Sequence, residues 1–180
     1  MLFKQLNLDF KIAIPTLKEK NTKVKYKSPS KYCMHLANLK CTNIADFYND
    51  SIVIGADTIV YFKNKIYNKP KNKQDAMRQL ASLSNKTHIV YTGVSIISKN
   101  KNIDILFYEK TYVTFNKLLK SDIKHYIKLY NPMDKSGSYG IQDWSAVFVK
   151  KIHGCYNNVI GFPLSKFYKL SIENKLINHG

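Results

Sequence analysis

Two long β-rich runs, separated by a short polar segment, set the first limit on the fold of this chain. Residues 88–97 and 103–115 are rich in isoleucine, valine, threonine, tyrosine and phenylalanine, the side chains that strands favour. Between them, residues 98–102 read Ser-Lys-Asn-Lys-Asn, which is typical of a turn. Together the three segments predict a β-hairpin with two long strands, around which the rest of the chain must be arranged.

Helical patterns and shorter strands surround this hairpin in the sequence. Helix starts are indicated at Ser28, Gln74, Ser121 and Leu164. Further strands are expected at residues 10–14, 51–54, 59–62 and 146–152. Because helices alternate with hairpin-linked and crossover strands, the sequence predicts an α/β fold with a mixed sheet.

Length and composition place the chain among globular domains. With 180 residues, 44% hydrophobic and 13% aromatic, it is long enough to bury a core and unlike a disordered chain. No apolar run approaches the roughly 18 residues of a membrane span. Lys4, Asp9 and Lys11 interrupt the apolar run that a secretory leader would need. We therefore expect a single cytoplasmic domain over residues 1–180.

The formal net charge of +17 raises the question of an anionic partner. Arg78 is the only arginine among the 29 basic residues, and the lysines are spread through nearly every segment. Recognition of base edges and phosphates favours arginine, because its planar donors bind two acceptors at once. The composition therefore favours a general lysine bias over anionic small ligands, and it ranks polymeric nucleic acid last.

A short apolar strand that ends in a carboxylate is the strongest local indication of chemistry. Residues 52–58 read Ile-Val-Ile-Gly-Ala-Asp-Thr, which places Asp57 at the carboxyl edge of the expected sheet, where α/β folds bind ligands. Glycine and alanine leave room for a ligand near the backbone. Taken alone, the segment is equally consistent with a strand-ending turn and a capping aspartate.

Two further segments carry polar groups at restrained positions. Lys69 precedes Pro70, which favours an extended lysine, although in isolation Lys69 is most simply one surface lysine of many. Residues 134–142 contain spaced glycines that let backbone amides approach an anion, and they end in Gln142, whose amide is both donor and acceptor. The three cysteines and five histidines show no metal-ligand spacing. We assign them no chemical role.

Several segments match one known family in order and in spacing. They are residues 36–40, 53–58, 69–70, 80–94, 132–142 and 158–164. In these segments the chain resembles the Maf family of nucleoside triphosphate pyrophosphatases. The resemblance implies a twisted mixed central sheet flanked by helices, similar to that of inosine triphosphatases, with a cleft between two lobes. A homodimer is one assembly that it allows, and it implies no membrane partner.

The resemblance also implies a reaction. A nucleoside triphosphate would be hydrolysed between its α- and β-phosphates, with Mg²⁺ or Mn²⁺ as the divalent cofactor, and a positioned water would attack without a protein nucleophile. Catalytic roles are implied for Asp57, Glu19 and Lys69. Asp57 and Glu19 are also the implied metal ligands. Substrate-binding roles are implied for Lys40, Thr58, Lys135 and Gln142.

Two details refine these expectations. Residues 55–58 and 139–142 read Gly-Ala-Asp-Thr and Tyr-Gly-Ile-Gln, which is similar to members that favour dTTP, UTP and modified pyrimidine triphosphates and remove non-canonical nucleotides. The family's opening strand and its Ser-x-Ser-Pro-Arg-Arg phosphate loop have no counterpart here, and we expect them to be missing before residue 1. A catalytically impaired nucleotide-binding protein is therefore the first alternative, and a basic nucleic-acid-binding protein is the second.

Overall fold

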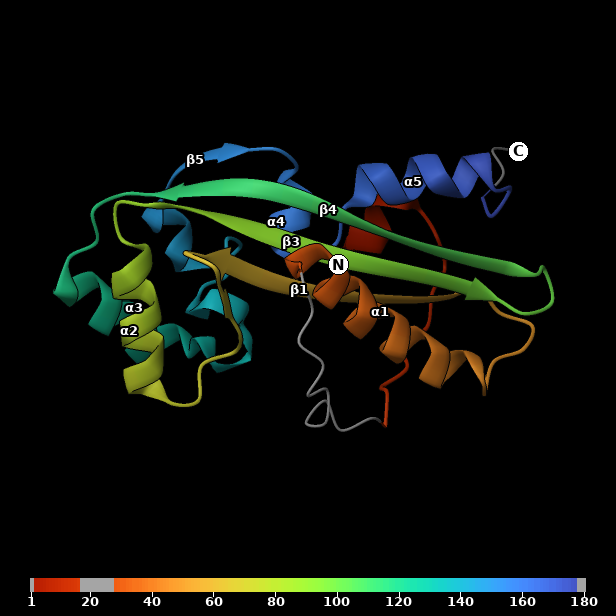
Figure 1. Ribbon diagram of the computed structural model, residues 1–180, viewed down its shortest axis with the longest axis horizontal. Coiled ribbons are helices and arrows are strands. Elements are labelled where there is room, and N and C mark those ends of the chain that lie inside the picture. Colours follow the sequence, from red (N-terminus) through yellow and green to blue (C-terminus); the bar gives the residue numbers. More distant parts are fainter. Residues whose placement is uncertain (1, 17–27, 178–180) are drawn as a thin grey trace. The chain divides into compact units, whose positions relative to one another are not determined.

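A five-stranded sheet with helices packed against it forms the centre of the computed structural model, which describes residues 2–16 and 28–177 (Figure 1). The strands are β1 Val53–Phe62, β2 Lys65–Tyr67, β3 Thr87–Ser98, β4 Ile103–Phe115 and β5 Val149–His153. The α-helices are α1 Pro29–Ala45, α2 Lys73–Leu83, α3 Lys120–Tyr130, α4 Tyr156–Ile160 and α5 Leu164–Glu173. Short 3-10 helices are η1 Leu2–Leu6, η3 Pro132–Asp134, η4 Ser136–Ser138 and η5 Trp144–Phe148. Within the described ranges, no helix has the length and apolar character needed to cross a bilayer.

The chain divides into two compact units, each made of separate segments. Unit 1 holds the described residues of Met1–Asp57, Thr92–Glu109 and Gly161–Gly180. Unit 2 holds Thr58–Tyr91 and Lys110–Ile160. Strands β1, β3 and β4 each contribute residues to both units. Each unit has its own buried core. The single domain over residues 1–180 stays a prediction.

The strand directions differ from the mixed parallel and antiparallel sheet that the sequence predicts. The strand order is β2-β1-β3-β4-β5, with antiparallel pairing of β1 with β2 and of β4 with β5. Strand β1 runs from unit 1 into unit 2, and the next elements, β2 and α2, also belong to unit 2. Strand β3 therefore begins in unit 2 and runs back into unit 1, antiparallel to its neighbour β1. The connection through α2 is thus not a crossover between parallel strands. The α/β class, with helices flanking one sheet, is confirmed.

In unit 1, helix α1 lies directly on the sheet because two glycines leave no side chains between them. A Cβ atom at Gly55 of β1 would lie 2.6 Å from the carbonyl oxygen of Ala37. A Cβ atom at Gly93 of β3 would lie 2.5 Å from the carbonyl oxygen of Cys33. Both distances are far below van der Waals contact, so any larger side chain would push α1 away. Small residues on α1, including Cys41, complete this close contact and are almost fully buried.

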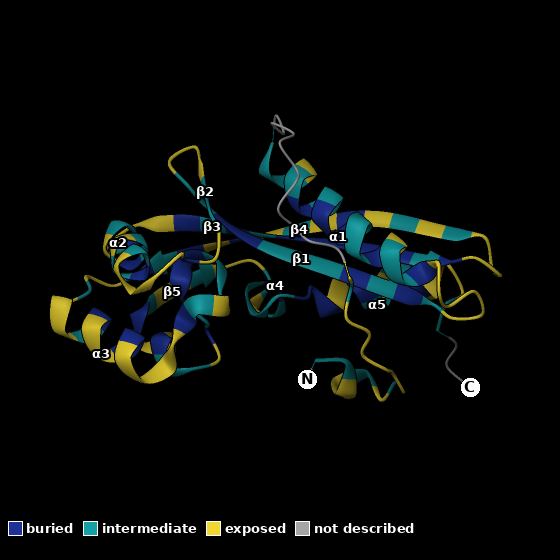
Figure 2. Ribbon diagram, turned by 90° about the horizontal axis from the view of Figure 1, so that it is seen from below, coloured by how far each residue is buried: buried dark blue, intermediate teal, exposed yellow. Residues whose placement is uncertain are grey.

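Unit 2 encloses a core that is rich in aromatic side chains. Its buried members include Val60, Leu80, Val113, Phe115, Tyr126, Tyr139 and Phe148. The Phe115 ring lies 4.8 Å from that of Tyr139 and 6.0 Å from that of Phe148, measured between ring centroids. In Figure 2, α2 and α3 each combine a buried face with an exposed one. Because Tyr139 belongs to this core, packing holds the glycine-bearing loop of residues 134–142 in place.

Most predicted elements are confirmed. The long hairpin is present as β3 and β4, and α2 and α5 lie where the apolar periodicity placed them. Helix α1 starts at the expected point, where the Ser28 hydroxyl accepts a hydrogen bond from the Lys31 amide and Pro29 occupies the first turn. Local signals were sufficient at these positions because capping and side-chain periodicity agree with the packing.

Four predicted features are wrong. The strand expected to end at Asp57 continues to Phe62, because Ile59 and Val60 extend it, so Asp57 lies inside β1 and not at the carboxyl edge of the sheet. The segment 10–14 forms no strand, and Ile12 and Ile14 are 68% and 84% exposed. The cap expected at Ser121-Asp122 is not formed, because α3 begins one residue earlier and the Ser121 hydroxyl donates to the Asp122 carboxylate instead. The first part of the strand expected at 146–152 belongs to η5, and β5 begins only at Val149.

Candidate functional site

The residues predicted for the site fall into three groups. Glu19 lies outside the described residues, and its role stays a prediction. Lys40 and Asp57 belong to unit 1. Thr58, Lys69, Lys135 and Gln142 belong to unit 2. Asp57 and Thr58 are consecutive residues of β1.

In unit 1, Lys40 and Asp57 form a short ion pair. The Lys40 Nζ atom of α1 donates a hydrogen bond of 2.6 Å to the Asp57 Oδ1 atom of β1. Their side chains are 25% and 13% exposed, so water screens the pair only in part. The close approach of α1 at Gly55 brings the two residues together, and the Cys41 thiol next to Lys40 donates to the Val53 carbonyl. The pair therefore fixes the orientation of the predicted catalytic carboxylate.

A buried cysteine beside this pair cannot serve as a nucleophile near neutral pH. Burial, with a smaller contribution from the negative charge of Asp57, raises the pKa of the Cys33 thiol to about 12. Only the thiolate form of cysteine is strongly nucleophilic. Cys33 is therefore a packing residue on the face of α1 that lies against Gly93 of β3.

In unit 2, the glycine-bearing loop of residues 134–142 is fastened to both β1 and α2. The Ser136 hydroxyl donates to the Thr58 carbonyl at 2.9 Å, and the buried Ser138 hydroxyl donates to Gln79 Oε1 at 2.7 Å. Between them, Gly137 has φ +72°, and a Cβ atom there would lie 2.8 Å from the Val60 side chain. Glycine is required at this position because the backbone is left-handed and lies against the strand. The loop is therefore a fixed structure.

Two of the predicted lysines influence the same carboxylate. The Lys135 Nζ atom donates to Asp134 Oδ1 at 2.9 Å, and its stem lies against Gly140, where a Cβ atom would come within 2.7 Å of Lys135 Cε. The pKa of Asp134 is lowered, chiefly by this hydrogen bond, with smaller electrostatic contributions from Lys135 and Lys69. Lys69 and Lys135, 66 positions apart in the chain, thus both lower the pKa of this one carboxyl group in unit 2.

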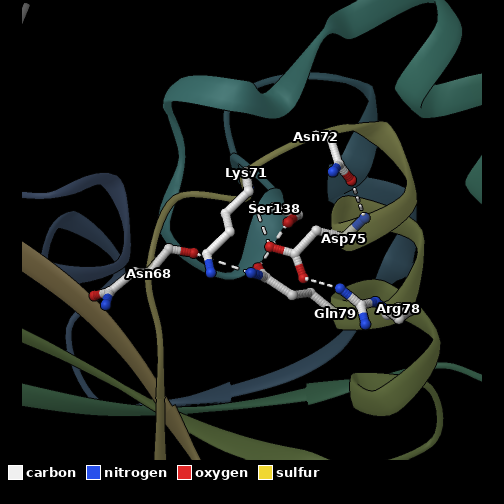
Figure 3. Close-up of polar contacts among 7 residues, drawn as sticks. All are labelled: Asn68, Lys71, Asn72, Asp75, Arg78, Gln79 and Ser138. Atoms are coloured by element: carbon white, nitrogen blue, oxygen red, sulfur yellow. Dashed lines mark hydrogen bonds and ion pairs between the residues drawn. The ribbon is translucent and has the colours of Figure 1, made fainter.

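The backbone on either side of Lys69 is held by side chains of α2 (Figure 3). The carbonyl oxygen of Asn68 accepts a hydrogen bond of 3.2 Å from Gln79 Nε2. The amide of Lys71 donates a hydrogen bond of 3.0 Å to Asp75 Oδ2. Lys69 itself is exposed, so a well-held backbone presents a solvent-facing ammonium group.

The predicted base-reading residue, Gln142, is exposed at the end of the loop. The residues around it are fixed. The amide of Gly140 donates to the Ser145 hydroxyl at 3.1 Å, and Asp143 Oδ2 accepts a hydrogen bond of 3.0 Å from Tyr126. Ile141 directly before it is buried. Gln142 is therefore an exposed amide on a rigid support, an arrangement that suits recognition of a ligand edge.

The predicted metal has a carboxylate of suitable chemistry in unit 1. Asp57 offers an oxygen ligand, which Mg²⁺ and Mn²⁺ both favour. Mg²⁺ commonly binds through one or two carboxylates together with substrate phosphates rather than in a cage of protein ligands. Over the described ranges, no group of three His, Cys, Asp or Glu side chains could form such a cage. Asp57 fits the phosphate-assisted mode, with Glu19 as the second predicted ligand.

Sequence reading missed the residues that hold this machinery in place. Gln79, Ser138 and Asp75 fix the lysine segment and the loop, but each has an ordinary residue type at an ordinary position. The positive φ of Ser138, +63°, is a structural signal that the sequence does not carry. Only their partners in the folded chain identify them, and the partners lie from four to 59 positions away.

Comparison with known proteins identifies the family. The family model described as Maf-like protein matches residues 1–173. A dTTP/UTP pyrophosphatase of Bacillus cereus (strain Q1) is 44% identical over 168 residues, which cover 93% of this chain and 86% of that protein. A dTTP/UTP pyrophosphatase of Thermosipho melanesiensis is 43% identical over 176 residues, which cover 98% and 92%. The resemblance seen in the sequence is confirmed, and the chain belongs to the Maf family.

Proposed function

We propose that this chain is a pyrophosphatase of nucleoside triphosphates, with dTTP, UTP and modified pyrimidine nucleotides as substrates. It would cleave between the α- and β-phosphates and so remove non-canonical nucleotides. Two relatives at 43% and 44% identity carry the name dTTP/UTP pyrophosphatase. The structural observation that carries the proposal is in unit 2. There, Lys135 donates to Asp134 within a loop that is fixed to β1 and α2, and Lys69 follows Asn68, whose carbonyl is held by the same helix.

Three lysines would supply the positive charge that a triphosphate requires. Lys69 and Lys135 in unit 2 and Lys40 in unit 1 each end in an ammonium group, which binds phosphate oxygens as a point charge. Lys40 and Lys135 each donate to an aspartate in this structure. An ammonium group has three N–H donors, so each lysine can bind a phosphate oxygen while it keeps its aspartate partner.

Asp57 is the residue that we assign to the hydrolytic step. A carboxylate at this position can take a proton from the attacking water or hold a divalent cation. Bound Mg²⁺ or Mn²⁺, with Asp57 and Glu19 as ligands, would neutralise charge on the polyphosphate. The 2.6 Å hydrogen bond from Lys40 holds Asp57 Oδ1 in one orientation. Such orientation lowers the barrier because the carboxylate needs no rearrangement when the reaction occurs.

Base choice would depend on Gln142 and on the support beneath it. The Gln142 amide can pair with a pyrimidine carbonyl and a ring N–H at the same time. A ligand that leaves such polar groups unpaired loses about 1–3 kcal/mol for each group that binding buries, which disfavours adenine because its edge has no carbonyl beside a ring N–H. Thr58 contributes through its carbonyl, which accepts from Ser136 and so anchors the loop that carries Gln142.

The test is pyrophosphate release from the eight standard ribo- and deoxyribonucleoside triphosphates. We expect dTTP and UTP to be cleaved well ahead of ATP and GTP, and release to stop when EDTA removes the divalent cation. Asp57→Asn should abolish release, and Gln142→Leu should narrow the pyrimidine preference with little effect on metal dependence. Lys101→Ala, in the exposed hairpin turn, is the matched control and should behave as the wild type. Equal cleavage of all eight substrates, or near-normal turnover by Asp57→Asn, would contradict the proposal.

A further inference from the structure

We infer that Gln79 is a positioning residue that holds the segment around Lys69 and the loop of residues 134–142 in one arrangement, so that both engage the same polyphosphate. The inference rests on the proposed function, because it concerns how the phosphate-binding lysines are set relative to each other. It names a residue of α2 that contacts the supports of the site rather than the substrate.

The side-chain amide of Gln79 uses both of its polar atoms. Its Nε2 atom donates to the Asn68 carbonyl at 3.2 Å, next to Lys69. Its Oε1 atom accepts from the Ser138 hydroxyl at 2.7 Å, three residues beyond Lys135. Figure 3 shows the two bonds leaving the same amide toward different segments. One side chain therefore connects the stretch of backbone that carries Lys69 to the loop that carries Lys135.

The chemistry of the partners determines which way the amide faces. A backbone carbonyl can only accept, so the NH₂ group of Gln79 must point at Asn68. The oxygen then points at the Ser138 hydroxyl, which is able to donate. Glutamate could keep the bond to Ser138, but it would face the Asn68 carbonyl with a negative oxygen. Leucine has a similar size and would lose both bonds, so these two substitutions separate the two contacts.

At the loop end of this connection, Ser138 has a strained backbone and a buried hydroxyl that needs a partner. Its backbone is left-handed, with φ +63°, and the residue is fully buried. Left-handed backbone at a residue other than glycine is strained and persists where the surroundings hold it. A buried hydroxyl that loses its partner is also costly. Loss of Gln79 should therefore loosen the loop as well as the lysine segment.

A second side chain of α2 holds the far side of the lysine segment. Asp75 accepts from the Lys71 amide, and it also accepts from Arg78 at 3.1 Å. Asp75 thus fixes the lysine segment to α2, whereas Gln79 fixes that segment and the loop together. Arg78, whose side chain is 78% exposed, lies beside Gln79 on α2 and binds Asp75 Oδ1, whereas the Lys71 amide binds Oδ2, so Arg78→Ala leaves the bond to the lysine segment in place. It is the matched control position.

The experiment compares the wild type with Gln79→Glu, Gln79→Leu, Ser138→Ala and Arg78→Ala in steady-state hydrolysis of dTTP. We expect KM to rise by about five- to tenfold in the first three variants, with a much smaller change in kcat, and no change in Arg78→Ala. The double variant Gln79→Leu with Ser138→Ala should be no worse than Gln79→Leu alone, because both remove one connection. Thermal unfolding shows which variants are folded. If a Gln79 variant does not fold, Ser138→Ala tests the loop contact in its place.

Hydrogen exchange gives a readout that needs no nucleotide. Gln79→Leu should speed amide exchange in residues 66–72 and 134–142, whereas Arg78→Ala should leave both segments unchanged. Unchanged exchange in both segments would overturn the inference, and so would KM values equal to that of Arg78→Ala in an active enzyme. If the wild type releases no pyrophosphate from dTTP or UTP, the proposed function fails, and exchange then decides whether Gln79 holds the two segments.

Discussion

At the scale of single residues, the Lys40–Asp57 ion pair has a structural role and a proposed chemical role, and experiments can separate the two. Each side chain is mostly buried, so either single change leaves the other charge without this partner. We expect Asp57→Asn and Lys40→Met each to lower the free energy of unfolding by about 1–3 kcal/mol. The double variant should lose less than the sum, because neither charge remains.

The measurement is denaturant unfolding together with pyrophosphate release. Activity should stay absent in the double variant even where stability is recovered, because the carboxylate is still missing. A double variant as unstable as the sum of the two single variants would show that the ion pair is not what stabilises this part of unit 1.

His88 gives unit 2 a dependence on pH. Burial lowers its pKa from 6.5 to about 3, and its Nε2 atom lies 2.7 Å from the Tyr139 hydroxyl oxygen. The folded protein therefore keeps His88 neutral at pH values where the unfolded chain binds a proton. As pH falls from about 6.5 toward 3, stability should decrease by up to about 1.4 kcal/mol per pH unit from this group.

The double variant His88→Phe with Tyr139→Phe tests this origin without leaving an unpaired hydroxyl in the core. Its free energy of unfolding should fall less steeply over the same pH range than that of the wild type. Urea unfolding at several pH values gives both slopes, and equal slopes would assign the pH dependence to other groups.

At the scale of elements, the contact of α1 with the sheet sets the geometry of Asp57. Gly55 lies two residues before Asp57 and faces α1 in the stretch that leads to Lys40, whereas Gly93 faces the start of the helix at Cys33. We expect Gly55→Ala and Gly93→Ala each to destabilise the protein by about 1–3 kcal/mol, because the added methyl group meets backbone atoms.

Activity should distinguish the two glycine variants. Gly55→Ala should lower kcat/KM for dTTP more than Gly93→Ala does at similar loss of stability, because it displaces α1 beside the Lys40–Asp57 pair. Melting temperature and steady-state kinetics of both variants provide the comparison. The expectation fails if both variants lose activity only in proportion to stability.

At the scale of the whole molecule, the sequence predicts where elements lie better than how they pair. The long strands β3 and β4 follow from their β-branched and aromatic residues, and α1 follows from its cap. The directions of the strands could not be predicted from the sequence, because the direction of β3 depends on the end of the sheet at which the chain returns after α2. The segment 10–14 alternates in the sequence but lies exposed outside any strand, since alternation alone cannot supply a neighbouring strand.

The candidate site divides in the same way. Asp57, Lys69 and Gln142 stand in motifs that can be read directly from the sequence. The residues that hold the lysine segment and the loop of unit 2 cannot be identified from the sequence, because Ser138 and Gln79 are 59 positions apart and meet only after folding. Their residue types carry no signal, since serine and glutamine are common in loops and helices. The sequence therefore predicts the candidate catalytic and binding residues, but not the residues that hold them in position.

The interleaving of the two units has a consequence for how such a protein can change over generations. The chain passes between the units after Asp57, Tyr91, Glu109 and Ile160, so neither unit corresponds to one continuous stretch of coding sequence. No single cut in the gene gives two fragments that each encode one whole unit: a cut after Asp57, for example, keeps unit 2 together but separates the first segment of unit 1 from its other two. Exchange of one unit for its counterpart in a related gene would therefore need several breakpoints, whereas substitution in place needs none.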